Sequence, residues 1–233
     1  MRVVAVVCTY WPKRRENVRR IVADLQAGSL PPDRILLLNN AVEPFEVAGA
    51  DVIHAPCNTA CRGKFIAALF DRADYYLLLD DDTSVGPRTL EALSQYARRG
   101  ICTGYLGCWI DGPVVSGPGQ PHLWPHDATE ETPCHTFCGC AMFVAWDALV
   151  RMLMLEERVR RDGRWPTEGD DILLGLANHS TVVPLRGDEN FVDLGYQGEA
   201  MCYQPGDYYG MRGEFTRDVV AALAKHPLPD WEV

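Results

Sequence analysis

The sequence predicts an α/β fold in which a mostly parallel central sheet is flanked by helices, and three features indicate it. Residues 2–10, RVVAVVCTY, form a continuous β-branched run that is typical of a strand buried on both faces. Between residues 16 and 27, apolar side chains recur at helical spacing, and GSLPPD ends the helix. Residues 34–40, RILLLNN, are typical of a second buried strand, which completes a strand–helix–strand unit.

The same alternation continues along the chain. Residues 51–56 predict a short strand, residues 61–73 a helix, and residues 75–82, YYLLLDDD, a third long buried strand. A further helix is expected over residues 87–100. Glycine, proline, histidine and tryptophan then crowd residues 104–137, which indicates short strands and long loops.

Regular structure is expected again in the C-terminal part. Residues 138–161 predict a strand that runs into a helix, and residues 165–180 predict a loop that leads into a helix at two aspartates. No internal repeat or linker divides the chain, so we expect one domain over residues 1–233.

Composition and charge restrict the function. The chain has 233 residues, 47% of them hydrophobic, and its formal net charge of −10 argues against nucleic-acid binding by general electrostatic attraction. No run reaches the length of a membrane span, and MRVVAVVC is too short for the core of a signal peptide. We therefore expect a soluble, cytoplasmic protein. Nine cysteines, an odd number in mixed contexts, favour reduced thiols over a disulfide framework.

Polar residues follow the predicted strands at their carboxyl ends, where open α/β sheets bind ligands. We expect Thr9-Tyr10, Asn39-Asn40 and Asp80 to Asp82 to gather there. Three adjacent carboxylates repel one another unless positive charge lies among them. Strand alternation would place Asp80 and Asp82 on one Mg²⁺ or Mn²⁺, while Asp81 points elsewhere or turns with the chain. An acidic turn without a metal is the alternative.

Several segments occur in the order and spacing of a metal-dependent glycosyltransferase of the GT-A fold. They are VVCTYWPKRRENVRRIVADL, RILLLNNA, YYLLLDDDTSV, CGCAMFVAWDAL and EGDDILLGL. The chain resembles this family over nearly its whole length. Because of LLLDDDT, GDDILLGL and GYQG…YYGMR, it looks most like the exostosin-type transferases, which are retaining, and it also resembles the inverting, family 2-like transferases.

The resemblance implies a nucleotide-sugar donor, an Mn²⁺ or Mg²⁺ cofactor and roles for particular residues. The nucleotide pocket would be lined by Thr9, Tyr10 and Asn39. The base and the diphosphate would be approached by Asn58, Arg62 and Lys64. The ribose and the metal would be bound by Asp80, Asp81 and Asp82, with Asp82 and Asp80 as the metal ligands.

The chemistry of sugar transfer supports these roles. The leaving diphosphate must be neutralised, which a cation and an arginine can do. We predict Asp82 for the metal and Arg212 for the diphosphate, although a surface salt bridge would also account for Arg212.

A second acidic cluster, Glu168, Asp170 and Asp171, lies at the start of a predicted helix. An aspartate there is an ordinary cap. With two aspartates, one can cap the helix while the other acts on the acceptor side as a catalytic residue. It would be the general base in an inverting reaction, or would stabilise positive charge at the anomeric carbon in a retaining one.

Two other signals have simpler explanations. Zinc-type ligands occur at His122, His126, Cys134, His135, Cys138 and Cys140, but no CxxC pair is present. Basic stretches occur at Lys13 to Arg15, Arg19-Arg20 and between Arg158 and Arg164. Such stretches are most often solvated helix faces; beside an acceptor cleft they would favour a polyanion such as hydroxymethylated DNA bases.

The sequence thus predicts an enzyme that moves a hexose or pentose from a nucleotide sugar, a UDP-sugar, to a hydroxyl acceptor. The acceptor would be a glycan, a small molecule or a modified DNA base. Residues 1–100 would bind the donor and residues 101–233 the acceptor. The alternatives are a nucleotidyltransferase, although CTYWPKRREN lacks the glycines of a phosphate loop, and a binding module that keeps the site without turnover. No feature indicates an oligomeric state.

Overall fold

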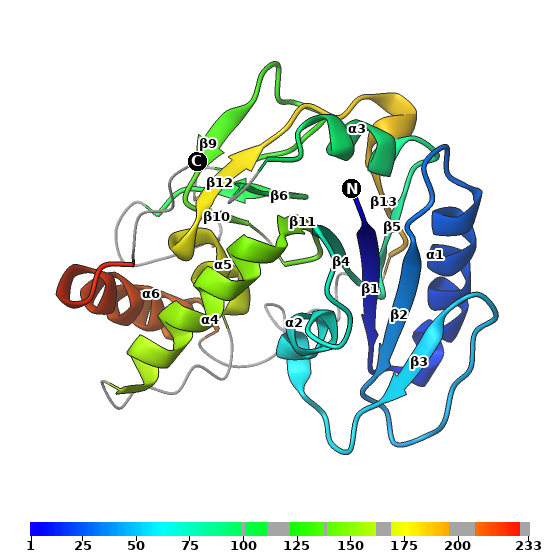
Figure 1. The fold of residues 1–233 in the computed structure, drawn as a ribbon, viewed down its shortest axis with the longest axis horizontal. Helices are drawn as coiled ribbons and strands as arrows, with labels where there is room; N and C mark the ends of the chain where they lie inside the picture. Colours follow the sequence, from blue (N-terminus) through cyan, green and yellow to red (C-terminus); the bar gives the residue numbers. More distant parts are fainter. Residues whose placement is uncertain (99–100, 111–121, 138, 162–168, 196–207, 229–233) are drawn as a thin grey trace.

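The computed structural model describes residues 1–98, 101–110, 122–137, 139–161, 169–195 and 208–228. Its centre is an eight-stranded sheet with the strand order β3-β2-β1-β4-β11-β6-β12-β9. Helices lie on both sides of this sheet (Figure 1). The predicted α/β class, with a mostly parallel central sheet between helices, is confirmed.

The N-terminal half of the sheet is entirely parallel. It consists of β1 (Val3–Thr9), β2 (Arg34–Asn39), β3 (Asp51–His54) and β4 (Tyr75–Asp80). Every residue of β1 is buried, as its β-branched sequence predicts. The carboxyl ends of these four strands therefore meet at one edge of the sheet.

The C-terminal half mixes directions. The main sheet continues with β11 (Ala141–Ala145), β6 (Ile101–Gly104), β12 (His179–Val182) and β9 (Thr132–Cys134). β11 runs antiparallel to both β4 and β6, while β6 and β12 are parallel to each other. Two small sheets complete the fold: β7 (Gly107–Cys108) with β8 (His122–Leu123) and β10 (Thr136–Phe137), and β5 (Thr83–Val85) with β13 (Phe191–Asp193).

The helices divide between the two faces of the sheet (Figure 1). One face is covered by α1 (Arg15–Ala27) and α3 (Thr89–Gln95), whose apolar residues join Val3, Ala5 and Val7 in one core. The other face is covered by α2 (Gly63–Ala68), α4 (Trp146–Arg161), α5 (Asp170–Ala177) and α6 (Tyr208–Lys225). Short 3₁₀ turns occur at Pro12–Arg14, Ala60–Arg62 and Gly187–Glu189.

Three predicted elements differ in extent. The helix expected over residues 61–73 spans only Gly63–Ala68, and beyond its end Asp71 pairs with Arg2 and Arg34 at 2.6 and 3.0 Å. The helix expected over residues 87–100 spans only Thr89–Gln95. The strand expected over residues 75–82 ends at Asp80, and the next two aspartates form a turn into β5.

Within the described ranges, no helix has the length and apolar character needed to cross a membrane. The described cysteines, which are Cys8, Cys57, Cys61, Cys102, Cys108, Cys134 and Cys140, form no disulfide with one another.

Candidate active site

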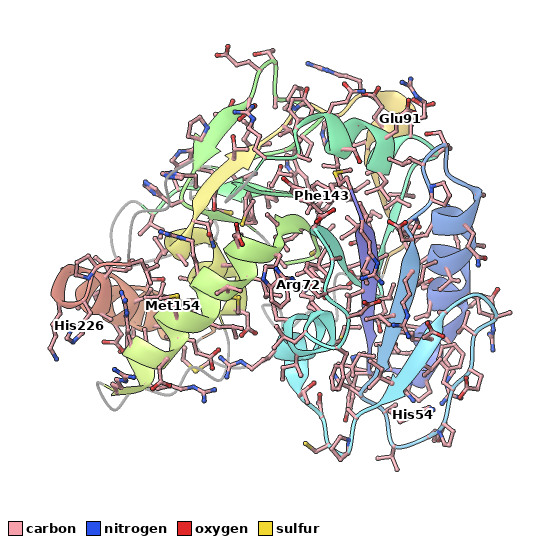
Figure 2. All side chains as sticks on the ribbon, viewed as in Figure 1. His54, Arg72, Glu91, Phe143, Met154 and His226 are labelled. Atoms are coloured by element: carbon pink, nitrogen blue, oxygen red, sulfur yellow. The ribbon has the colours of Figure 1, made fainter. Side chains whose placement is uncertain are left out.

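The carboxyl ends of the parallel strands bring the predicted polar residues together. In the sheet register Thr9 lies beside Asn39, and Cys8 lies beside Asp80. His54, the last residue of β3, marks this edge in Figure 2, and Glu91 of α3 is labelled at the opposite end of the molecule. The structure therefore groups Thr9, Asn39 and Asp80 as the sequence predicted, while their roles stay predictions.

Two side-chain cations lie among the three carboxylates. Arg14 Nη1 lies 2.6 Å from Asp81 Oδ1 and 3.2 Å from Asp82 Oδ2, and all three residues are buried. Lys64 Nζ lies 2.6 Å from Asp80 Oδ1, and its side chain is only 1% exposed. The protein itself thus supplies positive charge to the acidic run. The prediction of a solvated helix face is wrong for Arg14, because the turn at Pro12–Arg14 directs it toward the end of β4.

The turn after β4 decides how the three carboxylates are divided. Because the strand ends at Asp80, alternation does not place Asp80 and Asp82 on one side with Asp81 opposite. Asp81 and Asp82 instead share Arg14. Asp81 also accepts a hydrogen bond of 2.7 Å from Thr9 Oγ1. The sequence left open whether Asp81 points away from its neighbours or turns with the chain, and in the structure Asp81 lies in the turn.

Burial changes the acidity of this cluster. Burial raises the pKa of Asp80 to about 6, although Lys64 acts in the opposite direction. Burial likewise raises the pKa of Asp82, against the influence of Arg14. Burial also acts to lower the pKa of Lys64, but the Asp80 carboxylate outweighs it, so the pKa of Lys64 is raised. The ionised carboxylates would therefore be stabilised by further positive charge nearby.

Asp80 and Asp82 would hold a divalent cation only as part of a larger ligand set. Asp80 Oδ1 faces Lys64 and Asp82 Oδ2 faces Arg14, while Asp82 Oδ1 accepts a hydrogen bond of 3.3 Å from Thr83 Oγ1. Among the described residues, no group of three or more His, Cys, Asp or Glu side chains is arranged to hold a metal. Mg²⁺ and Mn²⁺ in nucleotide sites take one or two carboxylates together with water and phosphate oxygens. The two aspartates therefore suit a metal that arrives with a diphosphate.

The same finding applies to the cysteine and histidine residues considered for zinc. No metal group is formed by those that the structure describes, and Cys138 lies outside the described residues. Cys108 and Cys134 are buried. Their environment is that of small core side chains.

The segment after β3 carries Asn58 and Arg62. Asn58 Oδ1 accepts a hydrogen bond of 2.9 Å from the amide of Ala60, whose φ of +51° is unfavourable for a residue with a Cβ atom. Arg62 Nε lies 3.0 Å from Asp170 Oδ1, and its Nη1 lies 3.1 Å from Glu156 Oε1. Arg62, expected near the base or the diphosphate, is thus held by acidic residues of the C-terminal half.

The second acidic pair opens α5, and a glycine makes this start possible. Gly169 has a φ of +112°, and a Cβ atom there would lie 2.6 Å from the Phe215 ring. Glycine therefore lets the chain turn into the helix while α6 packs closely against it. Asp170 is buried, and burial raises its pKa against the effect of Arg62.

Asp171 and Arg212 form a two-point ion pair. Arg212 Nη1 lies 3.1 Å from Asp171 Oδ1, and Nη2 lies 2.8 Å from Oδ2. Their side chains are 5% and 12% exposed, so this is a buried pair rather than the surface salt bridge that was the alternative for Arg212. The pair joins two residues that the sequence had predicted as catalytic. Glu168 lies outside the described residues.

Gly139, which precedes β11, lies where the two acidic groups meet. Its carbonyl oxygen accepts a short hydrogen bond from Lys64 Nζ. A Cβ atom at this position would lie 3.7 Å from Lys64 Nζ and 3.9 Å from Asp171 Oδ2. The Asp80–Lys64 pair and the Asp171–Arg212 pair are therefore close neighbours. The end of β4 and the start of α5 are thus linked through Lys64 and Gly139.

Arg14, Glu156 and Gly139 belong to this arrangement but were not among the predicted site residues. Arg14 occurs in the sequence as part of a basic run, and Glu156 as part of the charged stretch EERVRR. Neither context distinguishes a buried partner from a solvated one. Gly139 lies in CGCAMFVAWDAL, a segment that belongs to the resemblance, but no role was assigned to this glycine itself.

Comparisons with known proteins support the fold. Two crystal structures of S. aureus TarS residues 1–349 are 12% identical to the chain. The first matches with a TM-score of 0.51, over 97% of this chain and 73% of the TarS chain. The second, in complex with UDP-GlcNAc, matches with a TM-score of 0.59, over 98% of this chain and 68% of the TarS chain. A further crystal structure of S. aureus TarS, also 12% identical, matches with a TM-score of 0.53, over 82% of this chain and 36% of the TarS chain. No protein-family profile and no curated protein matches the chain.

The fold is of the GT-A type, as predicted. The likeness concerns the fold that both parts of the expected resemblance share, and it gives no support to the exostosin-type part. At this level of identity the comparison concerns the arrangement of the chain in space.

Proposed function

We propose that the chain is a glycosyltransferase that moves a sugar from a nucleotide-sugar donor to the hydroxyl group of an acceptor. One observation carries the proposal: Lys64, which pairs with Asp80 at the end of β4, and Asp171 at the start of α5 both lie within 4 Å of the position of a Cβ atom on Gly139, at the carboxyl edge of a GT-A sheet. A UDP-sugar is the donor we propose, because one solved structure with this fold contains UDP-GlcNAc.

The donor half would use Thr9, Tyr10 and Asn39 around the nucleotide. Tyr10 is 41% exposed and contacts Trp11 edge to face at 5.0 Å, so its ring is accessible to a base. Asp80 and Asp82 would hold Mn²⁺ or Mg²⁺, which, when bound, supplies positive charge for the leaving diphosphate. Lys64 and Arg14 fix the orientation of these carboxylates.

The acceptor half would use Asp171 as general base in an inverting transfer. Asp171 would take the proton of the acceptor hydroxyl as its oxygen bonds to the anomeric carbon. The bond from that carbon to the diphosphate breaks, and its electron pair leaves with the diphosphate. Arg212 holds both oxygens of Asp171, so we assign it an orienting role in place of the predicted contact with the diphosphate.

Titration calorimetry of UDP, with Mn²⁺ and again with excess EDTA, tests the donor site. We expect UDP to bind only with the metal and Asp82→Asn to weaken binding at least tenfold. Asp171→Asn should keep UDP affinity within twofold while slowing UDP release from a UDP-sugar and acceptor by about 10²- to 10⁴-fold. The matched control is Asp51→Asn at the start of β3, where the side chain is 60% exposed.

The outcomes separate the alternatives. UDP binding that survives both EDTA and Asp82→Asn would remove the metal assignment. Binding without turnover of any UDP-sugar by the wild-type protein would favour a non-catalytic binding module. Release of pyrophosphate from a nucleoside triphosphate would favour a nucleotidyltransferase.

A further inference from the structure

A groove of about 280 Å³ runs between α2 and α4, next to the candidate active site. Both helices lie on the same face of the sheet (Figure 1), and each contributes one side to the groove. The α2 side consists of Arg62, Phe65, Ile66 and Leu69. The α4 side consists of Met152, Leu153, Glu156, Glu157 and Arg160. Both sets follow helical spacing, so they are the facing sides of the two helices.

The groove changes character along its length. At one end, Arg62 contacts Glu156 of α4 and Asp170 of α5, which places that end beside the acidic pair of the site. Toward the other end the lining becomes apolar. Ile66 and Leu69 there are 40% and 41% exposed, so both present apolar surface at the groove. A molecule with its reactive end at Asp171 could lay an apolar tail along this lining.

The charges of the groove favour an uncharged occupant. Arg62 is balanced by Glu156 and Asp170, Arg160 pairs with Glu156, and Arg161 pairs with Glu157 at 3.0 Å. No excess positive charge is left for a polyanion.

Three residues of the basic stretches elsewhere are balanced in the same way. Arg14 is buried against Asp81 and Asp82, and Arg19 and Arg20 of α1 pair with acidic residues one turn away. These contacts reduce the positive charge that those stretches would offer to a polyanionic acceptor such as modified DNA.

We infer that the groove between α2 and α4 binds the apolar part of the acceptor. The acceptor class is then an amphiphile: a hydroxyl-bearing head near Asp171, joined to an uncharged hydrocarbon group along Ile66 and Leu69. The acceptor role rests on the proposed function, whereas the binding of an apolar group does not.

The test compares octyl β-D-glucoside with methyl β-D-glucoside, which share a head group and differ in chain length. Binding of each is measured by calorimetry below the micelle concentration, for the wild type, Leu69→Glu and Phe70→Glu. Phe70 is the matched control, because it is 68% exposed, adjacent in sequence and outside the groove lining. UDP binding with Mn²⁺ and sedimentation of each variant are measured in parallel.

We expect the octyl compound to bind at least tenfold more tightly than the methyl compound, since burial of about two methylenes already gives such a factor. Leu69→Glu should remove this advantage, and Phe70→Glu should keep it within twofold, with UDP affinity and the sedimentation coefficient unchanged in both.

Equal binding of the two glucosides to the wild type would overturn the inference. So would an equal loss of the preference for the octyl compound in Leu69→Glu and Phe70→Glu. A wild-type dimer that Leu69→Glu dissociates would also overturn it, because the groove would then be a contact between two copies of the chain. Failure of the proposed function looks different, because UDP would then not bind to the wild type while the chain-length preference remained.

Discussion

Arg14→Met tests whether a side chain is the main counter-charge of the acidic turn. The substitution keeps much of the apolar stem and removes the guanidinium that lies 2.6 Å from Asp81 and 3.2 Å from Asp82. Both aspartates are buried, at 5% and 7% exposure, so their charges lose their partner without gaining water. Breaking a buried ion pair from one side costs about 3–5 kcal/mol of unfolding free energy.

Urea denaturation followed by circular dichroism measures this loss. With a slope of about 3 kcal/mol per molar urea for a chain of this size, the midpoint should fall by roughly 1–1.7 M. The double variant Arg14→Met/Asp81→Asn should regain at least half of the loss, because one of the two stranded charges is gone. A cost below about 1 kcal/mol, or no recovery in the double variant, would refute the reasoning, because buried charges without a partner cannot be that cheap.

Two further variants test the neighbouring contacts. Lys64→Met removes the group that lowers the pKa of Asp80, which is already raised to about 6, so the Asp80 carboxyl should keep its proton near neutral pH. Calorimetry should then show weaker Mn²⁺-dependent UDP binding at pH 6.5 that recovers toward pH 8.5. A loss of UDP binding that does not depend on pH would contradict this. Ala60→Gly should raise the unfolding free energy by about 1 kcal/mol in urea denaturation, because glycine tolerates the positive φ at this position. The control Ala92→Gly, within α3, should lower the unfolding free energy by a similar amount. An unchanged urea midpoint for Ala60→Gly would mean that no strain is stored there.

The parallel half of the fold could be predicted because its signals are local. The runs at Val3–Thr9 and Arg34–Asn39 are apolar along their whole length, and the helix between them carries a regular stripe. The C-terminal helix Tyr208–Lys225 was not predicted as a helix. Its sequence has glycine at two positions and only a weak apolar face, and its helix is supported by packing of Phe215 and Val219 against the core.

The direction of β11 was also beyond the sequence. Ala141–Ala145 is as apolar as the parallel strands, but it lies antiparallel between β4 and β6. Direction depends on where the preceding segment places the chain, and a buried strand has the same composition in either direction.

The edge on which the site lies could be predicted, but the partners within it could not. Thr9, Asn39 and Asp80 meet because parallel strands end together, which follows from topology. The contacts of Arg14 with Asp81 and of Arg212 with Asp171 join segments 67 and 41 residues apart. Both arginines stand in sequence contexts that suit a surface position equally well, so only the packed chain distinguishes the pairs.

Gly139 restricts the size of the side chain at this point of the candidate site. A methyl group at this position would touch Lys64 and Asp171 at ordinary contact distances of 3.7 and 3.9 Å, so alanine fits without displacing either. A larger side chain would bring further atoms against Lys64 or Asp171. Under the proposed function, such a side chain would take space from the donor sugar or the acceptor, so substitution at this one position offers a way to alter substrate size without changing the charges around it.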